Sequence, residues 1–508
     1  MDKQSAYESA YTGISPYLKR VFFAVFTVSF LWVFVQVVFI NKQGFDPVLS
    51  VFLITVFSAL FMGAYVMMRQ AGLTVRTGSR ILLAFIVVSG VLQIAAGLRL
   101  RYTPAFDLDA IFGGGRDWAL DGDFSRYRDY FGMFSNNLGG LFLYRCLFSV
   151  GRLFGVSDFY FLALIYNTLM LQVMVIAVYD TARRLAGVGA AVLSLLLFGA
   201  FIPWYMMGAV FYTDLLSAPF VALCLYFYLR AKTETRLKQK AVWYLCFGIV
   251  TAIGSILKFT VMIAAVAALI DLLLSIRRSK GLSLKRVLLN IAIPVAAVGI
   301  TAALLFGFYR YMDTQQDAEL VFSRRLPVTH WVMMGLNGNG QYDPGEYDFS
   351  MGLADLAARR EEIPKVIRMR IRERGFAGMF GLFTEKAAID FGDGTYHLSD
   401  FLADGPVNET TLHDLVLPDG RHYDAYKHIA QGGYLAFFLL MLIGGLMSVI
   451  RPGRFIAPWL ALFGLLLFLL FWETNTRYTQ NFMPVLILCA VLGVHTLLDG
   501  SSREKSIP

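Results

Sequence analysis

The stretch VFFAVFTVSFLWVFVQVVFIN, residues 21–41, decides the class of fold because it carries no charged side chain. A helix needs about 20 apolar residues to cross the hydrocarbon core of a bilayer. Similar runs recur along the chain, which has 508 residues, of which 57% are hydrophobic and only 16% are charged. These runs are too long and continuous for the alternating strands of an outer-membrane barrel. We therefore expect an all-α polytopic membrane protein.

About twelve segments are predicted to span the membrane. They are residues 21–41, 48–68, 81–100, 158–179, 187–206, 212–230, 241–257, 259–276, 287–308, 433–450, 455–472 and 481–498.

The formal net charge of +9 comes largely from short basic clusters between these segments. Lysine and arginine are enriched in cytoplasmic loops of membrane proteins. With the N-terminus inside, the clusters at Arg69, Arg183, Lys238 and Arg277 all fall on the cytoplasmic side. We therefore expect a plasma-membrane protein with both termini in the cytoplasm, and we expect no nucleic-acid binding.

Two long segments are then predicted to face the exterior. In the first, 101–157, the piece at 136–156 is apolar but is interrupted by Arg145 and Arg152, so it is predicted to lie as an amphipathic helix in the outer interface. The second, 309–432, is polar and contains turn signals such as NGNG and DPG. Within it, Asp355–Gly375 is predicted to form one or two helices, with Pro364 starting a new one.

The chain is accordingly divided into three parts. These are an N-terminal transmembrane region at 1–308, which includes the external loop 101–157, an external loop module at 309–432, and a C-terminal transmembrane region at 433–508.

Two aspartates, Asp107 and Asp109, follow the third predicted span in the stretch FDLDAIFGGGRDWALDGDF. Such a pair either shares a cation, leaves one carboxylate free as a base, or is simply solvated in an external loop. Aromatic and amide residues follow, among them Tyr130, Asn136 and Asn137. Carboxylate, aromatic and amide groups at a membrane surface suit a polyhydroxylated ligand.

Charged residues beside other spans are further candidates. Lys258, between two apolar helices, either snorkels to lipid phosphate or binds the phosphate of a specific lipid substrate. Asp214 either caps the sixth predicted span or supports a site. In FWETNTRYTQNFMP, Arg477 is a bidentate phosphate ligand or an ion-pair partner of Glu473, and Tyr478 follows directly.

The long external segment offers His330, which either contacts a sugar or phosphate or is structural. The alternation from Asn337 to Asp343 differs from a calcium loop, because it lacks an acidic first position and a terminal glutamate. The Asp107–Asp109 pair permits a divalent cation without requiring it, so no cofactor is predicted with certainty and the metal is left unknown. The four cysteines have no zinc-site spacing.

Together these stretches resemble the GT-C superfamily of integral-membrane glycosyltransferases, which use polyprenyl-phosphate-linked sugars. FDLDAIFGGGRDWALDGD resembles the first external loop with its catalytic Asp, and YFGMFSNNLGGLFLYRCLFSVGRLFG resembles the interfacial segment that follows it. SILKFTVMIAA resembles an outer tip of the bundle, ETNTRYTQNFMPVLILCA the C-terminal segment, and HWVMMGLNGNGQYD a loop of bacterial cell-envelope members. Ser135 and Phe259 stand where the family usually has proline.

The resemblance implies an inverting hexosyl or pentosyl transfer from a polyprenyl-phosphate-sugar donor, on the extracytoplasmic side of the membrane. The acceptor would be a glycan, a teichoic acid, a glycolipid or a protein of the cell envelope. Asp109 is the first choice as general base, because its distance to Gly122 matches the spacing in the family, and Asp107 is the second. Lys258 and Arg477, with His330 third, would bind the donor phosphate.

Other functions predict other features. A lipid or polysaccharide transporter would carry intramembrane charges along a path and a repeat relation between its halves. An O-antigen-type polymerase or ligase would depend on His330, Arg324 and Arg325 and would dispense with Asp109. A receptor or scaffold needs none of these residues.

Overall fold

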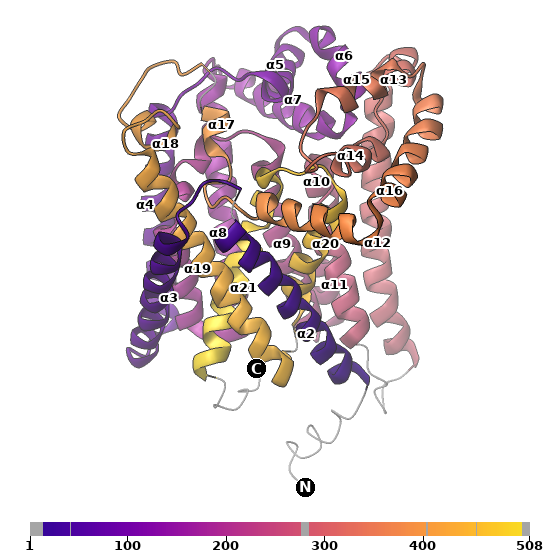
Figure 1. Cartoon of the computed structure of the whole chain (residues 1–508). Helices are drawn as coiled ribbons and strands as arrows, with labels where there is room; N and C mark the ends of the chain where they lie inside the picture. Colours follow the sequence, from indigo (N-terminus) through magenta and orange to yellow (C-terminus); the bar gives the residue numbers. More distant parts are fainter. Residues whose placement is uncertain (1–13, 41, 276–283, 403–404, 454, 500–508) are drawn as a thin grey trace.

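The computed structural model describes residues 14–40, 42–275, 284–402, 405–453 and 455–499. Long helices stand side by side in a bundle, and shorter helices gather at one end of it (Figure 1). The bundle helices are α2 (Ile14–Val35, continued by the π-helix η2, Gln36–Ile40), α3 (Pro47–Gln70), α4 (Val75–Arg99), α8 (Phe159–Ala200), α9 (Thr213–Thr233), α10 (Leu237–Leu257), α11 (Val261–Ser275), α12 (Leu284–Asp313), α19 (Tyr423–Ile450), α20 (Ala457–Phe471) and α21 (Met483–Asp499).

In the described part of the chain, nine helices are long and apolar enough to cross a membrane, and α11 and α20 are shorter apolar helices. Each predicted span falls on one of these helices. Two of them, 158–179 and 187–206, fall mainly on α8, a 42-residue helix that is broken at Gly187 with φ of 84°. The chain is therefore an all-helical polytopic membrane protein, while the number of twelve crossings stays a prediction. The termini and the Arg277 cluster lie outside the described residues.

Local chemistry sets where these helices begin. Asp46 precedes Pro47 at the start of α3, and its side chain accepts a hydrogen bond from the Leu49 amide. Asp158 caps α8 in the same way through the Phe161 amide and also binds Arg101 at 2.7 and 2.9 Å. A carboxylate that accepts from free amides satisfies donors which the first turn leaves unpaired.

Helices α5 (Phe106–Asp121) and α7 (Leu138–Leu153) pack against each other at the end where the shorter helices gather (Figure 1). Glycine allows the close approach, since a Cβ at Gly115 would lie 2.5 Å from the Cβ of Tyr144. Helix α7 covers the predicted interfacial segment and is not among the helices long enough to span. Its place in the membrane interface stays a prediction.

The predicted external module contains several short helices and one long one. They are α13 (Ala318–Arg324), α14 (Val328–Gly335), α15 (Pro344–Gly352), α16 (Leu356–Asp390), α17 (Leu398–Leu402) and α18 (His413–Val416). The edges proposed at 309 and 432 fall inside α12 and α19. The second half of α16 packs against α2, α20 and the 3₁₀-helix η7 (Thr476–Phe482), so this region rests on the bundle.

The prediction that Pro364 starts a new helix was wrong. Helix α16 runs through Pro364 and breaks at Gly375, where φ is 58° and ψ is −171°. Proline removes one backbone donor and bends a helix without necessarily ending it. Positive φ places strain on any residue with a Cβ, so a glycine is where the chain turns at low cost.

Candidate functional site

The candidate site is built around a buried ion pair between α9 and α10. Asp214 stands in the first turn of α9 and is fully buried, and Lys258 directly follows α10. Their Nζ and Oδ1 atoms are 2.8 Å apart. An unpaired buried carboxylate is strongly unfavourable, so each residue holds the other in place. Asp214 makes no side-chain cap for α9, whose N-cap is Tyr212.

Two tyrosine rings bring Arg477 beside this pair. The Lys258 Nζ lies 4.8 Å from the centre of the Tyr478 ring and 5.8 Å from that of Tyr212. The Arg477 guanidinium carbon lies 5.0 Å from the Tyr212 ring and 5.4 Å from the Tyr478 ring. All four distances are within cation–π range. The Nε of Arg477 is buried without a hydrogen-bond partner among the described residues, which leaves a donor for a ligand.

Glu473 completes this side of the site. It lies between α20 and η7, is buried, and accepts a hydrogen bond from the Tyr478 hydroxyl at 2.9 Å. Burial raises the pKa of Glu473, while the positive charge of Arg477 opposes that rise. The hydrogen bond of Glu473 thus goes to Tyr478, and Arg477 acts on it through charge.

Asp107 reaches the same group of residues from α5. Its two carboxylate oxygens accept hydrogen bonds from the hydroxyls of Tyr130 at 2.9 Å and Tyr212 at 3.0 Å. The Asn137 amide donates to the Tyr130 hydroxyl at 2.6 Å. A carboxylate has about four acceptor positions, so two donors leave room for a further one. Tyr212 therefore links Asp107 directly to the two cations.

Asp109 faces a different neighbour. It accepts a hydrogen bond from Tyr127 at 3.0 Å and lies against Gly113, where an added Cβ would stand 2.7 Å from its Oδ1. Residues two apart on a helix point about 200° away from each other. The two aspartates therefore have separate hydrogen-bond partners within the protein. Asn136 is exposed and donates to Asn137 at 3.3 Å.

His330 is not brought to this group. It is buried in α14, where its Nδ1 is 2.8 Å from the Ser350 hydroxyl. Burial lowers the pKa of His330 to about 4. A neutral imidazole cannot supply the positive charge that was expected of it toward a phosphate.

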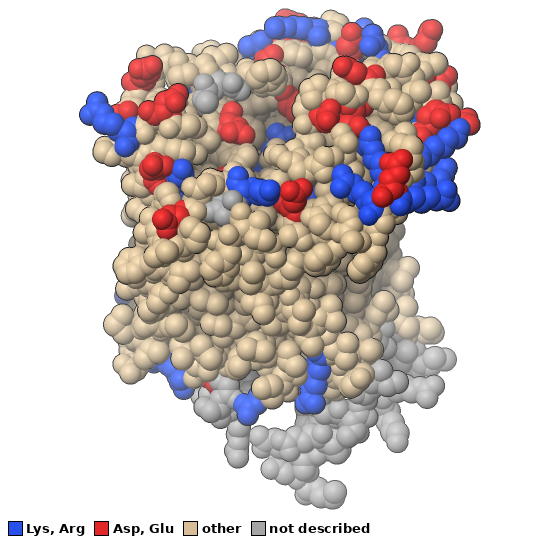
Figure 2. Space-filling view, in the orientation of Figure 1, with Lys and Arg blue, Asp and Glu red and all other residues tan. Residues whose placement is uncertain are grey.

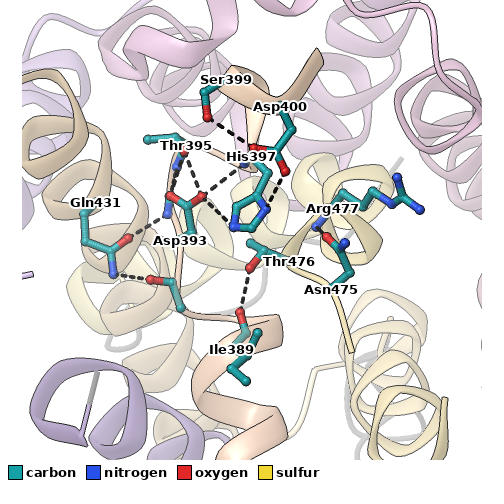
Figure 3. Close-up of polar contacts among 12 residues, drawn as sticks. Ile389, Asp393, Thr395, His397, Ser399, Asp400, Gln431, Asn475, Thr476 and Arg477 are labelled. Atoms are coloured by element: carbon teal, nitrogen blue, oxygen red, sulfur yellow. Dashed lines mark hydrogen bonds and ion pairs between the residues drawn. The ribbon is translucent and has the colours of Figure 1, made fainter. Parts of the chain in front are cut away.

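A second polar cluster adjoins Arg477 and was missed in the sequence (Figure 3). The end of α16 holds the start of η7 through two hydrogen bonds. The Asp390 carboxylate accepts from the backbone N–H of Asn475 at 2.9 Å, and the Ile389 carbonyl accepts from the Thr476 hydroxyl at 2.7 Å. Asn475 in turn caps η7 by accepting from the Arg477 amide at 3.1 Å. Arg477 is therefore positioned by α16.

The loop after α16 places His397 between two carboxylates. Its Nδ1 is 3.2 Å from Asp400 and its Nε2 is 3.6 Å from Asp393. Burial acts to lower the pKa of His397, but the two aspartates raise it above its usual value, with Arg477 opposing them. His397 has φ of 52°, an unusual value for a residue with a Cβ. A signal was present in the sequence DGTYHLSD, whose histidine has an aspartate four residues before it and another three after.

Buried Lys386 fixes the surroundings of Glu473. Its ammonium donates to the carbonyls of Gly335, at 2.9 Å, and of Trp472. Burial lowers the pKa of Lys386 to about 8. This side chain joins α16, α14 and the chain just before Glu473. Its position in the sequence gave no sign of that role. Among the described residues, no group of three or more His, Cys, Asp or Glu could hold a metal ion.

A family model described as "Conserved hypothetical integral membrane protein" matches residues 11–497. The chain belongs to this family. No curated protein matches the chain.

Two crystal structures of ArnT from Cupriavidus metallidurans are distantly similar to this family member. The form bound to undecaprenyl phosphate has 14% identity and a TM-score of 0.30, with 82% of this chain and 77% of that chain covered. The apo form has 15% identity and a TM-score of 0.30, with 83% and 78% covered.

Proposed function

We propose that the chain is a GT-C-type glycosyltransferase that moves a sugar from a polyprenyl-phosphate donor to a cell-envelope acceptor. The observation that carries the proposal is the shared position of Tyr212. Its ring contacts the two cations Lys258 and Arg477, while its hydroxyl binds Asp107. Departure of the phosphate requires cations that stabilise its charge. Activation of the acceptor hydroxyl requires a carboxylate nearby. Tyr212 contacts both kinds of group.

In the proposed reaction, the acceptor hydroxyl oxygen attacks the anomeric carbon of the donor sugar. The bond from that carbon to the phosphate oxygen breaks, and the polyprenyl phosphate leaves with the bonding electron pair. The acceptor proton passes to an aspartate carboxylate, and the anomeric configuration inverts. Lys258 and Arg477 stabilise the charge that grows on the leaving phosphate.

Asp107 is now the preferred base over Asp109. Each accepts tyrosine hydrogen bonds, but only Asp107 binds a tyrosine whose ring also contacts the cations. The base must lie within hydrogen-bond reach of the acceptor hydroxyl while the donor phosphate is bound. The hydrogen bond between Asp107 and Tyr212, whose ring contacts both cations, supports this choice.

The proposed sidedness has support from the ends of the helices. Lys258 lies where α10 ends, and Arg477 lies in η7, just before α21 begins. Arg69 forms an ion pair at 2.5 Å with Asp499, which is at the far end of α21. Lys232 likewise lies at the end of α9 opposite Asp214. Arg69 and Lys232 thus lie at the end away from the site. This fits cytoplasmic loops with an extracytoplasmic site.

The rival polymerase or ligase gains no support, because it depends on His330, which is buried and neutral at physiological pH.

The test of the proposed function is to incubate purified protein with a panel of polyprenyl-phosphate sugars and a cell-envelope extract as acceptor. We expect release of polyprenyl phosphate from at least one donor, and loss of release with Asp107→Asn. Sugar transfer that proceeds fully in both Asp107→Asn and Asp109→Asn would refute an aspartate base.

A further inference from the structure

Helix α16 presents a basic surface just before its bend at Gly375. Arg370 and Arg374 are engaged inside the protein, by Glu346 at 2.6 Å and by the Leu336 carbonyl at 3.2 Å. Arg368 and Arg372 are exposed and have no hydrogen bond or ion pair among the described residues. Four residues apart, they point to nearly the same side of the helix.

Beyond the bend, the same helix exposes aromatic side chains. Phe376 is 90% exposed and Phe380 is 55% exposed. The Phe380 ring lies 5.9 Å from Trp32 of α2, and the Phe383 ring lies 5.3 Å from Phe471 of α20. This half of α16 therefore lies across two apolar bundle helices, as Figure 1 also shows.

The position of the bend relative to the uncharged wall of the molecule indicates which kind of ligand binds there. In Figure 2 the lower wall of the molecule is almost free of charge, and Lys and Arg side chains gather where that wall meets the charged end. On α16, the arginines lie on one side of the bend and the exposed aromatic side chains on the other. This arrangement matches the phosphate and the acyl chains of a lipid leaflet. A protein partner would not require the arginines and the aromatic side chains to lie at these positions along the neighbouring bundle helices.

We propose that Arg368 and Arg372 bind the phosphate of an anionic phospholipid, with Phe376 and Phe380 against its acyl chains. Lys365 contributes less charge there, because Glu361 and Glu362 pair with it at 3.0 and 2.8 Å. This inference does not depend on the proposed transferase activity. It gives α16, whose far end positions Arg477, an anchor in the leaflet beside the candidate site.

The experiment measures lipid bound to the purified full chain by native mass spectrometry. Delipidated protein receives phosphatidylglycerol or phosphatidylcholine with identical acyl chains. We expect wild-type protein to prefer phosphatidylglycerol, and Arg368→Gln with Arg372→Gln to weaken that binding about 30-fold, from roughly 1 kcal/mol per basic residue near an anionic surface. Binding of phosphatidylcholine should be unchanged by the double variant.

The matched control is Arg126→Gln with Arg128→Gln, which removes the same charge from exposed residues between α5 and α7. An equal loss of phosphatidylglycerol in this control would overturn the proposal, because net charge alone would then explain binding. No lipid preference in the wild type would also overturn it. Independently, Phe376→Trp should add fluorescence that brominated acyl chains quench, and absence of quenching would refute the depth assigned to the bend.

Discussion

Replacing Lys258 by methionine should lower the free energy of unfolding by about 3–5 kcal/mol, the usual loss when one partner of a buried ion pair is removed. Asp214 is 0% exposed and Lys258 is 17% exposed, so the remaining carboxylate has no access to water.

The chain supplies a control of equal burial. Lys232 lies 2.5 Å from Asp271, and the two side chains have the same exposures of 17% and 0%. This pair is at the opposite end of α9 from Asp214. Lys232→Met should also cost stability, but less than Lys258→Met, because Asp271 keeps hydrogen bonds from Tyr228 and Ile456. It does not touch the candidate site.

Double variants separate stability from ligand binding. Combining Lys258→Met with Asp214→Asn removes the buried charge and should restore much of the stability, as should Lys232→Met with Asp271→Asn. If Lys258 binds the donor phosphate, the first double variant should still lose about 10- to 150-fold in kcat/KM, from about 1.5–3 kcal/mol for a hydrogen bond to a charged group. The second double variant should retain activity.

Two measurements decide the outcome. Unfolding is followed by circular dichroism during titration of mixed micelles with sodium dodecyl sulfate, and transfer is followed by release of polyprenyl phosphate. Equal activity in the two double variants would refute a ligand role for Lys258 and leave it as the partner of Asp214. A loss below about 1 kcal/mol in Lys258→Met would instead refute the argument from burial.

Three further predictions test the site, the pH response and the topology. Asp107→Asn should reduce transfer by about 10²–10⁴-fold, as expected for a general base, while Asp109→Asn should reduce it less; the reverse order in the release assay would return the role to Asp109. Because burial lowers the pKa of His330 from 6.5 to about 4, the unfolded chain binds a proton there that the folded chain does not. Its stability contribution is complete above pH 6.5 and should fall by up to about 3 kcal/mol as pH drops to 4, and unfolding titrations of His330→Gln should lose this slope. A cysteine at Asp348 should react with an impermeant thiol reagent added to intact cells, and labelling only after lysis would contradict the proposed sidedness.

The positions of the bundle helices were predictable because lipid imposes a simple length requirement on apolar runs. The breaks within the long helices were harder to predict from the sequence. Gly187 and Gly375 interrupt α8 and α16 through their backbone conformation, whereas Pro364 does not interrupt the part of α16 that precedes Gly375. Whether a glycine turns the chain depends on the packing of the segments on either side of it, and a single sequence does not contain that information.

Candidate residues in the site could be selected because charges beside apolar spans are costly and need a reason. Lys258, Arg477 and Asp214 were chosen in this way, and the structure places them together. The tyrosine that joins them was not chosen. Tyr212 has no unusual local context, and its importance comes from contacts with segments more than 40 residues away in either direction.

The same reasoning applies to the choice between the two candidate bases. In a loop, Asp107 and Asp109 could have pointed to one ligand. On α5 they point to nearly opposite sides, so each must be judged by its own neighbours. Asp107 contacts Tyr212, whose ring also contacts the cations Lys258 and Arg477, whereas Asp109 contacts Tyr127 within its own segment. A base must act on an acceptor held beside the departing phosphate, and this requirement is why we propose Asp107 before Asp109.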